Sequence, residues 1–129
     1  MDVYILDSDR ERPVREDNLD VWCQWMWDHK TDLVVARHRE DDTIIMTVFT
    51  GCDVRLGEYP TISHHAPIVW KTMVISEAGG KARETHHGTG TREDALVMHK
   101  RVCRRNHVRY SIVPGRILTW EEPEYELEA

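Results

Sequence analysis

Apolar residues recur with two different periods along this chain, and the changes of period divide it into strands and helices. Alternating or continuous β-rich runs predict strands at residues 3–7, 33–38, 43–50, 67–75 and 108–113. Three- and four-residue spacing predicts helices over residues 17–28 and 91–104. This order predicts an α+β fold, with a mostly antiparallel sheet of four to five strands and two helices on one face.

The first predicted helix is apolar on more than one side. Asp17 is expected to cap it, and the core face is expected to consist of Leu19, Trp22, Cys23 and Met26. Three further apolar residues lie off that face: Val21, Trp25 and Trp27. They predict a contact surface for a partner, because Trp is a frequent anchor in protein interfaces.

The second predicted helix starts with a clear capping signal. Thr91-x-x-Asp94 resembles a capping box, and the expected inward stripe is Ala95, Leu96, His99, Val102 and Cys103. A lone histidine on an apolar face is typical of a hydrogen-bonded core residue. The alternative for His99 is that its ring reaches a cleft beside Trp70.

Two predicted strands are apolar on both of their faces. In 43–50, Ile44, Met46 and Val48 oppose Ile45 and Phe49; in 67–75, Val69, Met73 and Ile75 oppose Ile68, Trp70 and Val74. Two helices cover only one face of a sheet well. We therefore expect the other face to be buried against a second copy, which predicts a homo-oligomer, most simply a two-fold dimer.

Four short blocks occur in a defined order: VYILD (3–7) ahead of a Trp-rich helix, TVFTGCD (47–53), PIVWKTMVI (67–75) and TREDALVMH (91–99). In this order they resemble a widespread group of small accessory proteins encoded by tailed phages and prophages. The likeness covers roughly residues 3 to 103. It departs from the group at Lys71, where the group usually has Glu, and residues 104–129 have no counterpart in it. The resemblance implies a phage setting and no particular chemistry.

Charge is distributed unevenly along the 129 residues, whose formal net charge is -6. The negative total argues against general nucleic-acid binding, which needs clustered Lys and Arg. Residues 1–118 are expected to form a single domain, followed by an acidic C-terminal tail at 119–129. Met1-Asp2 opens without a basic region and no apolar run approaches the length of a membrane span, so neither a signal peptide nor a membrane contact is expected.

A basic stretch without any acidic residue runs from His99 to Arg109, over the end of the second predicted helix and the start of the last predicted strand: Lys100, Arg101, Arg104, Arg105 and Arg109. Its simplest interpretation is a solvated helix end that suits the helix dipole. Alternatively it binds an anion, either an acidic surface on a partner or a nucleotide phosphate. A third possibility is that the acidic tail folds back on it.

Two long segments, 51–66 and 77–90, are predicted to be loops, and long loops are more often functional than structural. Each carries a His-His pair: His64, His65, His86 and His87. Imidazoles in neighbouring loops raise the hypothesis of a zinc site. Adjacent residues of an extended segment point in opposite directions, however, and no H-E-x-x-H, C-x-x-C or H-x-H motif organises them.

Catalytic signatures are missing from the sequence. Gly79-Gly80-Lys81 lacks the spacing of a phosphate-binding loop, and no G-x-S-x-G, paired-carboxylate or kinase motif occurs. The three widely spaced cysteines, Cys23, Cys52 and Cys103, are interpreted as reduced, mostly buried thiols in a cytoplasm. The sequence therefore predicts a protein that is not an enzyme and needs no cofactor.

The function predicted from these features is non-catalytic binding in the cytoplasm of a bacterial host. One form is attachment to a host protein or defence pathway through the Trp surface of the first helix and the charged ends. The alternative is sequestration of a small anionic signalling nucleotide by Arg83, Arg101, Arg104, Arg105, Trp70 and Tyr59. The second alternative is a metal-dependent hydrolase that uses the loop histidines.

Overall fold

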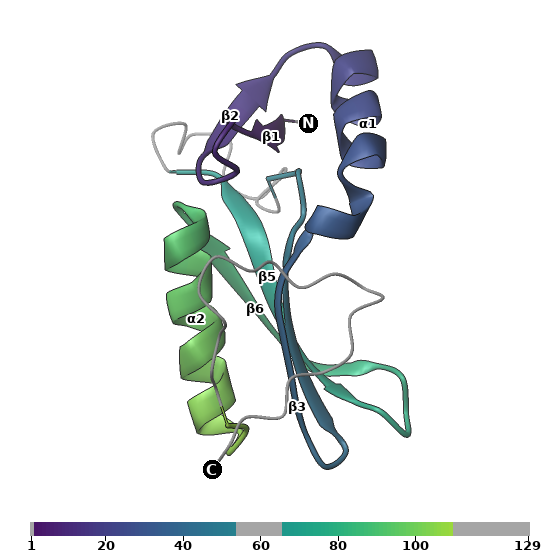
Figure 1. Cartoon of the computed structure of the whole chain (residues 1–129), viewed down its shortest axis with the longest axis vertical. Helices are drawn as coiled ribbons and strands as arrows, with labels where there is room; N and C mark the ends of the chain where they lie inside the picture. The colour runs from purple at the N-terminus through teal and green to yellow at the C-terminus, as the bar shows by residue number, and fades with distance from the viewer. Residues whose placement is uncertain (1, 54–65, 110–129) are drawn as a thin grey trace.

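The computed structural model describes residues 2–53 and 66–109. Within them the elements run in the order β1 (Val3–Leu6), β2 (Pro13–Glu16), α1 (Leu19–Asp28), η1 (Lys30–Asp32), β3 (Val34–Glu40), β4 (Thr43–Phe49), β5 (Ile68–Ser76), β6 (Ala82–Thr89) and α2 (Arg92–Arg105). Strands β3-β4-β5-β6 form an antiparallel four-stranded sheet, and β1 and β2 form a separate hairpin (Figure 1). The predicted α+β class is confirmed.

The first strand does not begin the main sheet, as the sequence led us to expect. β1 pairs with β2, from Val3 opposite Glu16 to Leu6 opposite Pro13. A tight turn causes this, because the Asp7 carboxylate accepts the backbone N–H of Glu11 at 2.9 Å and Arg10 adopts a left-handed conformation with φ of 58°. The chain therefore reverses at once and pairs with itself.

The segment 77–90 is also different from its prediction as a loop. It is a turn followed by β6, whose residues Ala82–Thr89 pair with β5. β6 contains no large apolar residue and alternates between exposed and half-buried positions, so it has no apolar alternation to reveal it in the sequence. Gly80 closes the turn with φ of 66° and its N–H donates to the Ser76 carbonyl at 2.8 Å.

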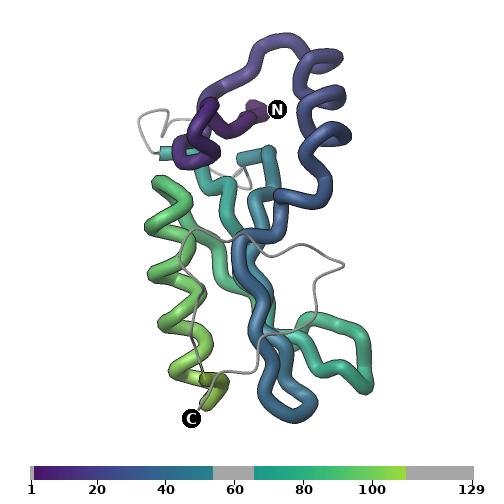
Figure 2. The backbone as a smooth tube through the Cα atoms, viewed as in Figure 1, coloured from purple at the N-terminus to yellow at the C-terminus, as the bar shows by residue number. Residues whose placement is uncertain are grey.

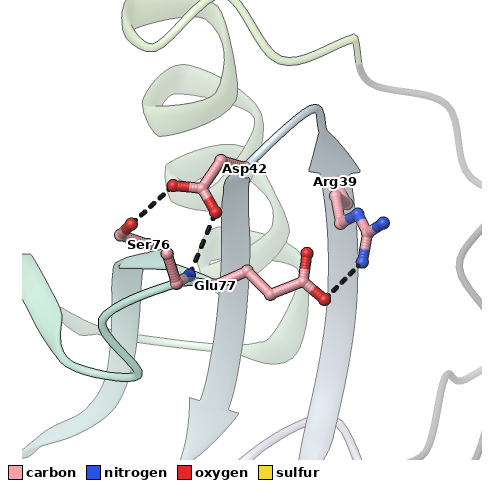
Figure 3. Close-up of polar contacts among 5 residues, drawn as sticks. Arg39, Asp42, Ser76 and Glu77 are labelled. Atoms are coloured by element: carbon pink, nitrogen blue, oxygen red, sulfur yellow. Dashed lines mark hydrogen bonds and ion pairs between the residues drawn. The ribbon is translucent and has the colours of Figure 1, made fainter.

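The two hairpin turns of the main sheet lie at the same end of the molecule (Figure 2) and are joined by side chains. The Asp42 carboxylate accepts a hydrogen bond from Ser76 Oγ at 2.6 Å and another from the Ala78 N–H at 3.0 Å (Figure 3). Beside them, Arg39 Nη1 lies 2.9 Å from Glu77 Oε1. These bonds, led by the one from Ser76, hold the pKa of Asp42 below its usual value.

Helix α2 lies along one face of the sheet and closes the main core (Figure 1). Thr91 caps it in a capping box with Asp94, as predicted. Its buried residues are Ala95, His99, Val102 and Cys103, which confirms the inward stripe except for half-buried Leu96. The helix packs on the sheet face that carries Ile45, Thr47, Trp70, Thr72 and Val74.

Helix α1 lies at one end of the main sheet, beside the β1–β2 hairpin that it contacts most (Figure 1). Trp22 Nε1 donates to the carbonyls of Tyr4 and Gly51, both at 3.1 Å. The Trp25 ring meets Phe49 edge-on with centroids 6.0 Å apart. Phe49 lies on the same side of β4 as Ile45, which packs under α2, so both helices pack on one face as expected.

The inward side of α1 was predicted correctly at Trp22 and Met26 but wrongly at Leu19 and Cys23. Asn18 rather than Asp17 caps the helix, accepting the N–H groups of Asp20 and Val21. The half-buried residues are Trp22, Trp25 and Met26, whereas Leu19 and Cys23 are exposed. The hydrogen bonds of Trp22 turn its side of the helix toward the hairpin, and a stripe through residues 22, 25 and 26 fits the same three- and four-residue spacing.

The opposite face of the main sheet is the face that we predicted to be buried against a second copy. Ile44 and Met46 are already buried within one chain, and Val48, Met73 and Ile75 are half-buried. Less apolar surface is therefore left for a second copy than the strand pattern suggested. Self-association stays a prediction. Within residues 2–53 and 66–109, no helix combines the length and apolarity needed to cross a membrane.

Substituting alanine for Gly51 is expected to lower the free energy of unfolding by about 1–3 kcal/mol, the usual cost of a strained backbone. Gly51 has φ of 72°, and an added Cβ would lie 2.9 Å from Met26 Cε and 3.1 Å from Trp22 Nε1. Gly79→Ala is the matched control, because nothing lies within 4 Å of its added Cβ. Urea denaturation compares the two variants, and equal stability would contradict this account of how α1 is anchored.

Candidate functional site

A chain of buried polar side chains runs between the sheet and α2. His38 of β3 and His99 of α2 face each other with Nδ1 and Nε2 2.8 Å apart. His99 Nδ1 lies 2.7 Å from Thr47 Oγ1 on β4, and Thr47 Oγ1 lies 2.6 Å from Thr72 Oγ1 on β5. All four residues are buried, with exposures of 0–1%. The chain thus links three strands and one helix in a solvent-excluded core.

Sheet register and helical spacing bring these groups together. Thr47 and Thr72 are directly opposite in the β4–β5 pairing, and His38 is opposite Ile45 in the β3–β4 pairing, on the same inward face. His99 is held over that face by the capped helix α2. Cys103 follows His99 by four residues, so it lies one turn along the same side of the helix.

Cys103 completes a cluster of donor atoms with the two histidines. One ligand atom from each of His38, His99 and Cys103 lies within 4.8 Å of the others. Burial, followed by the proximity of His38, lowers the pKa of His99 to about 3. Burial alone raises the pKa of Cys103 to about 12. Near neutral pH the metal-free cluster therefore contains a neutral imidazole at His99 and a protonated thiol at Cys103.

This cluster suits a role inside the fold better than turnover of a substrate. His38, His99 and Cys103 are each at most 1% exposed, so a substrate in solution does not reach them in this conformation. The raised pKa of the Cys103 thiol also disfavours a nucleophilic thiolate. The groups can stabilise the core by hydrogen bonding or hold a metal ion.

Only part of the cluster could be found from the sequence. The interpretation of His99 as a hydrogen-bonded core residue agrees with its burial and its two ring contacts. Cys103 was placed correctly on the same stripe. His38 was missed, because it is 61 positions from His99 and only the sheet brings the two rings together. The i, i+4 spacing of His99 and Cys103 was the available local signal.

A second candidate site is the outer side of α1. We use the name outer stripe for Leu19, Cys23 and Trp27, which follow one another at four-residue spacing. All three are exposed, Leu19 by 60% and Trp27 by 66%. The Lys30 ammonium lies 3.7 Å from the centre of the Trp27 ring. Of the surface predicted from Val21, Trp25 and Trp27, the structure exposes Val21 and Trp27, whereas Trp25 packs inward.

The predicted anion-binding arginines differ in exposure and in the contacts that they make within the chain. Arg101 and Arg104 are exposed on α2, and Arg105 Nη2 is 3.8 Å from Glu84 Oε1. Arg109 binds Glu40 through two nitrogens, with Nε at 3.0 Å and Nη2 at 3.2 Å, which lowers the pKa of Glu40. Arg83 Nη2 donates to Thr43 Oγ1 at 3.2 Å. Arg101 and Arg104 therefore remain the strongest candidates for contacts with an anion.

The predicted aromatic ligand contacts are not supported at Trp70. Trp70 is 0% exposed, lies in the core cluster with Phe49, and donates from Nε1 to the Gly90 carbonyl at 2.8 Å. Its two ring faces are occupied by the core rather than open to a nucleotide. Trp70 is therefore a core residue of β5, on the sheet face that α2 covers. Tyr59, the other predicted ring, lies outside the described residues.

The histidine pairs do not form the proposed loop site within the described residues. His86 belongs to β6 and its Nε2 contacts Glu84 Oε1 at 2.5 Å. His87 is exposed and points to the other side of the strand, as alternation requires. His64 and His65 lie outside the described residues. Among residues 2–53 and 66–109, the group able to hold a metal is instead His38, His99 and Cys103.

Comparisons of this chain with protein-family models, with curated proteins and with solved structures found no match. The resemblance to phage and prophage proteins therefore stays a prediction from the four sequence blocks. Function has to be inferred from the geometry of the described residues, in particular the outer stripe of α1 and the buried cluster under α2.

Proposed function

We propose that this chain is a non-catalytic binding protein that attaches to a host protein through the outer stripe of α1. The observation that carries the proposal is that α1 exposes two large apolar side chains, Leu19 and Trp27, on one line of the helix. None of its ten residues, all inside the described range 2–53, is fully buried. A phage or prophage origin and action in the bacterial cytoplasm belong to the same proposal.

The chemistry of the outer stripe favours a protein groove over a small ligand. Apolar residues at four-residue spacing on a helix typically bind in a complementary hydrophobic groove of the partner protein. Trp27 supplies an anchor of the kind that dominates binding energy in such interfaces. The polar residues beside the stripe, Asp20, Gln24 and Asp28, are exposed and would form the rim of the contact.

A nucleotide-binding role is less well supported. It relied on arginines near an aromatic ring, and the ring of Trp70 is buried in the core. Arg101 and Arg104 are exposed and could add charge complementarity to a protein interface. We therefore assign them a secondary role in the same binding function.

The double variant Leu19→Ser/Trp27→Ser is expected to lose host-protein capture. Truncating a central Trp anchor costs about 2 kcal/mol or more, which weakens binding at least ~30-fold. The fold should be kept, since exposed substitutions usually change stability by about ±0.5 kcal/mol. Capture from a bacterial host extract, followed by titration of the captured protein, measures the loss.

Val97→Ser is the matched control, because Val97 is an apolar residue of α2 that is 53% exposed. It should bind as the unmodified chain does. Equal capture by the outer-stripe variant and the Val97 variant would overturn the proposal. Capture that is lost in Arg101→Glu/Arg104→Glu but kept in the outer-stripe variant would instead assign binding to the basic stretch.

A further inference from the structure

Three metal-binding side chains converge in the core from two different elements. His38 comes from β3, while His99 and Cys103 come from successive turns of α2. Their ligand atoms lie within 4.8 Å of one another, and all three residues are buried. Two imidazoles and one thiol form a donor set that suits a borderline transition metal such as Zn²⁺.

The direct contact between the two imidazoles is informative. His38 Nδ1 and His99 Nε2 are 2.8 Å apart, so one of them must carry a proton that the other accepts. A metal ion can take the place of that proton and accept both lone pairs, with the proton of His38 moving to Nε2 so that both imidazole ligands stay neutral. Two nitrogens bound at about 2.05 Å in tetrahedral geometry lie roughly 3.3 Å apart. Metal binding therefore requires the 2.8 Å contact to open by roughly 0.5 Å.

The surroundings of His99 match those of a metal-bound imidazole. A ligating histidine usually donates its second ring N–H to an oxygen, which fixes the ring and its tautomer. His99 Nδ1 is 2.7 Å from Thr47 Oγ1, and Thr72 Oγ1 lies 2.6 Å beyond, ready to accept the Thr47 hydroxyl. The chain of bonds leaves His99 Nε2 directed at His38, on the side of the cluster.

We propose that His38, His99 and Cys103 bind one divalent transition-metal ion of the Zn²⁺ class between α2 and the sheet. The ion would join the helix to β3 through three protein ligands and would leave a fourth coordination position. Binding would release one proton, from the Cys103 thiol, since the bound sulfur is a thiolate. The site adds a function of the core and does not depend on binding through the outer stripe.

The untagged full-length chain, stripped with a chelator, is titrated with Co²⁺ and then with Zn²⁺. We expect one Co²⁺ per chain, with a thiolate-to-cobalt charge-transfer band and visible d–d bands that Zn²⁺ abolishes. Zn²⁺ should also raise the melting temperature, because it binds the folded chain. A correctly folded chain that shows neither the spectrum nor the shift would overturn the proposal.

Matched variants identify the ligands. Cys103→Ala should lose the charge-transfer band, whereas Cys23→Ala and Cys52→Ala should keep it; Cys103→Ser replaces the alanine variant if that one does not fold. Thr47→Val retains all three ligands and should weaken affinity about 10–100-fold with the band preserved. A band retained in the Cys103 variants, or lost with Cys23 or Cys52, would place the metal elsewhere and refute the assignment.

Discussion

Replacing Trp70 with alanine is expected to lower the free energy of unfolding by about 3–5 kcal/mol, a large part of the stability of an ordinary domain. Trp70 is 0% exposed and packs with Phe49, with ring centroids 5.1 Å apart. The variant also removes the donor that bonds to the Gly90 carbonyl just before α2. Urea denaturation, followed by circular dichroism, measures the change.

Two further variants separate the contributions to this loss. Trp70→Phe keeps an aromatic ring and should be less harmful than alanine, although it leaves the Gly90 carbonyl without its indole donor. Trp27→Ala should change stability by only about ±0.5 kcal/mol, because Trp27 is 66% exposed. If Trp70→Ala were fully stable but unable to bind an anionic ligand, Trp70 would be the ligand residue that the sequence suggested.

Acid is expected to destabilise the metal-free chain below about pH 6.5, the pKa of histidine in unfolded chains. Burial and the nearby His38 lower the pKa of folded His99 to about 3. Between pH 6.5 and about pH 3, His99 is therefore protonated in the unfolded chain but neutral in the folded chain. The free energy of unfolding falls as the pH falls through this range. The slope approaches about 1.4 kcal/mol per pH unit for this one group.

Denaturation in chelator at several pH values between 6.5 and 4.5 measures that slope. Asp7, Glu40 and Asp42 have lowered pKa values, so their stabilising effects are lost only at lower pH. His99→Leu should flatten the profile in this window, while His87→Gln, at an exposed position, should leave it unchanged. An identical slope in both variants would show that His99 is not the group responsible.

The parts of the fold that the sequence predicted well are those specified by nearby residues. The start of α2 follows from Thr91 and Asp94, three residues apart, and the turn between β3 and β4 follows from a short polar run. The inward side of α1 was only partly predicted, because two overlapping stripes that share Trp22 and Met26 satisfy helical spacing equally well. Hydrogen bonds from Trp22 to Tyr4 and Gly51, distant in sequence, decide between them.

The candidate site was harder to predict than the fold, because its residues are brought together by contacts between segments distant in sequence. His99 and Cys103 share a helix face and could be grouped, but His38 joins them only through the pairing of β3 with β4. The metal hypothesis drawn from the sequence involved the paired histidines, and alternation in β6 does send His86 and His87 to opposite sides, as that analysis anticipated for adjacent residues. β6 itself was missed because a strand of polar residues has no apolar pattern to detect.

The absence of fully buried residues in α1, throughout Leu19–Asp28 of the described chain, also affects how the protein can evolve. Substitutions at exposed positions usually cost little stability. Random changes at Leu19, Cys23 or Trp27 would therefore seldom be eliminated for misfolding. Because the sheet and α2 hold the fold constant, substitutions on the outer stripe would alter the partner preference that we propose for this helix without unfolding the chain. Such freedom would suit a protein whose target changes from one host to the next.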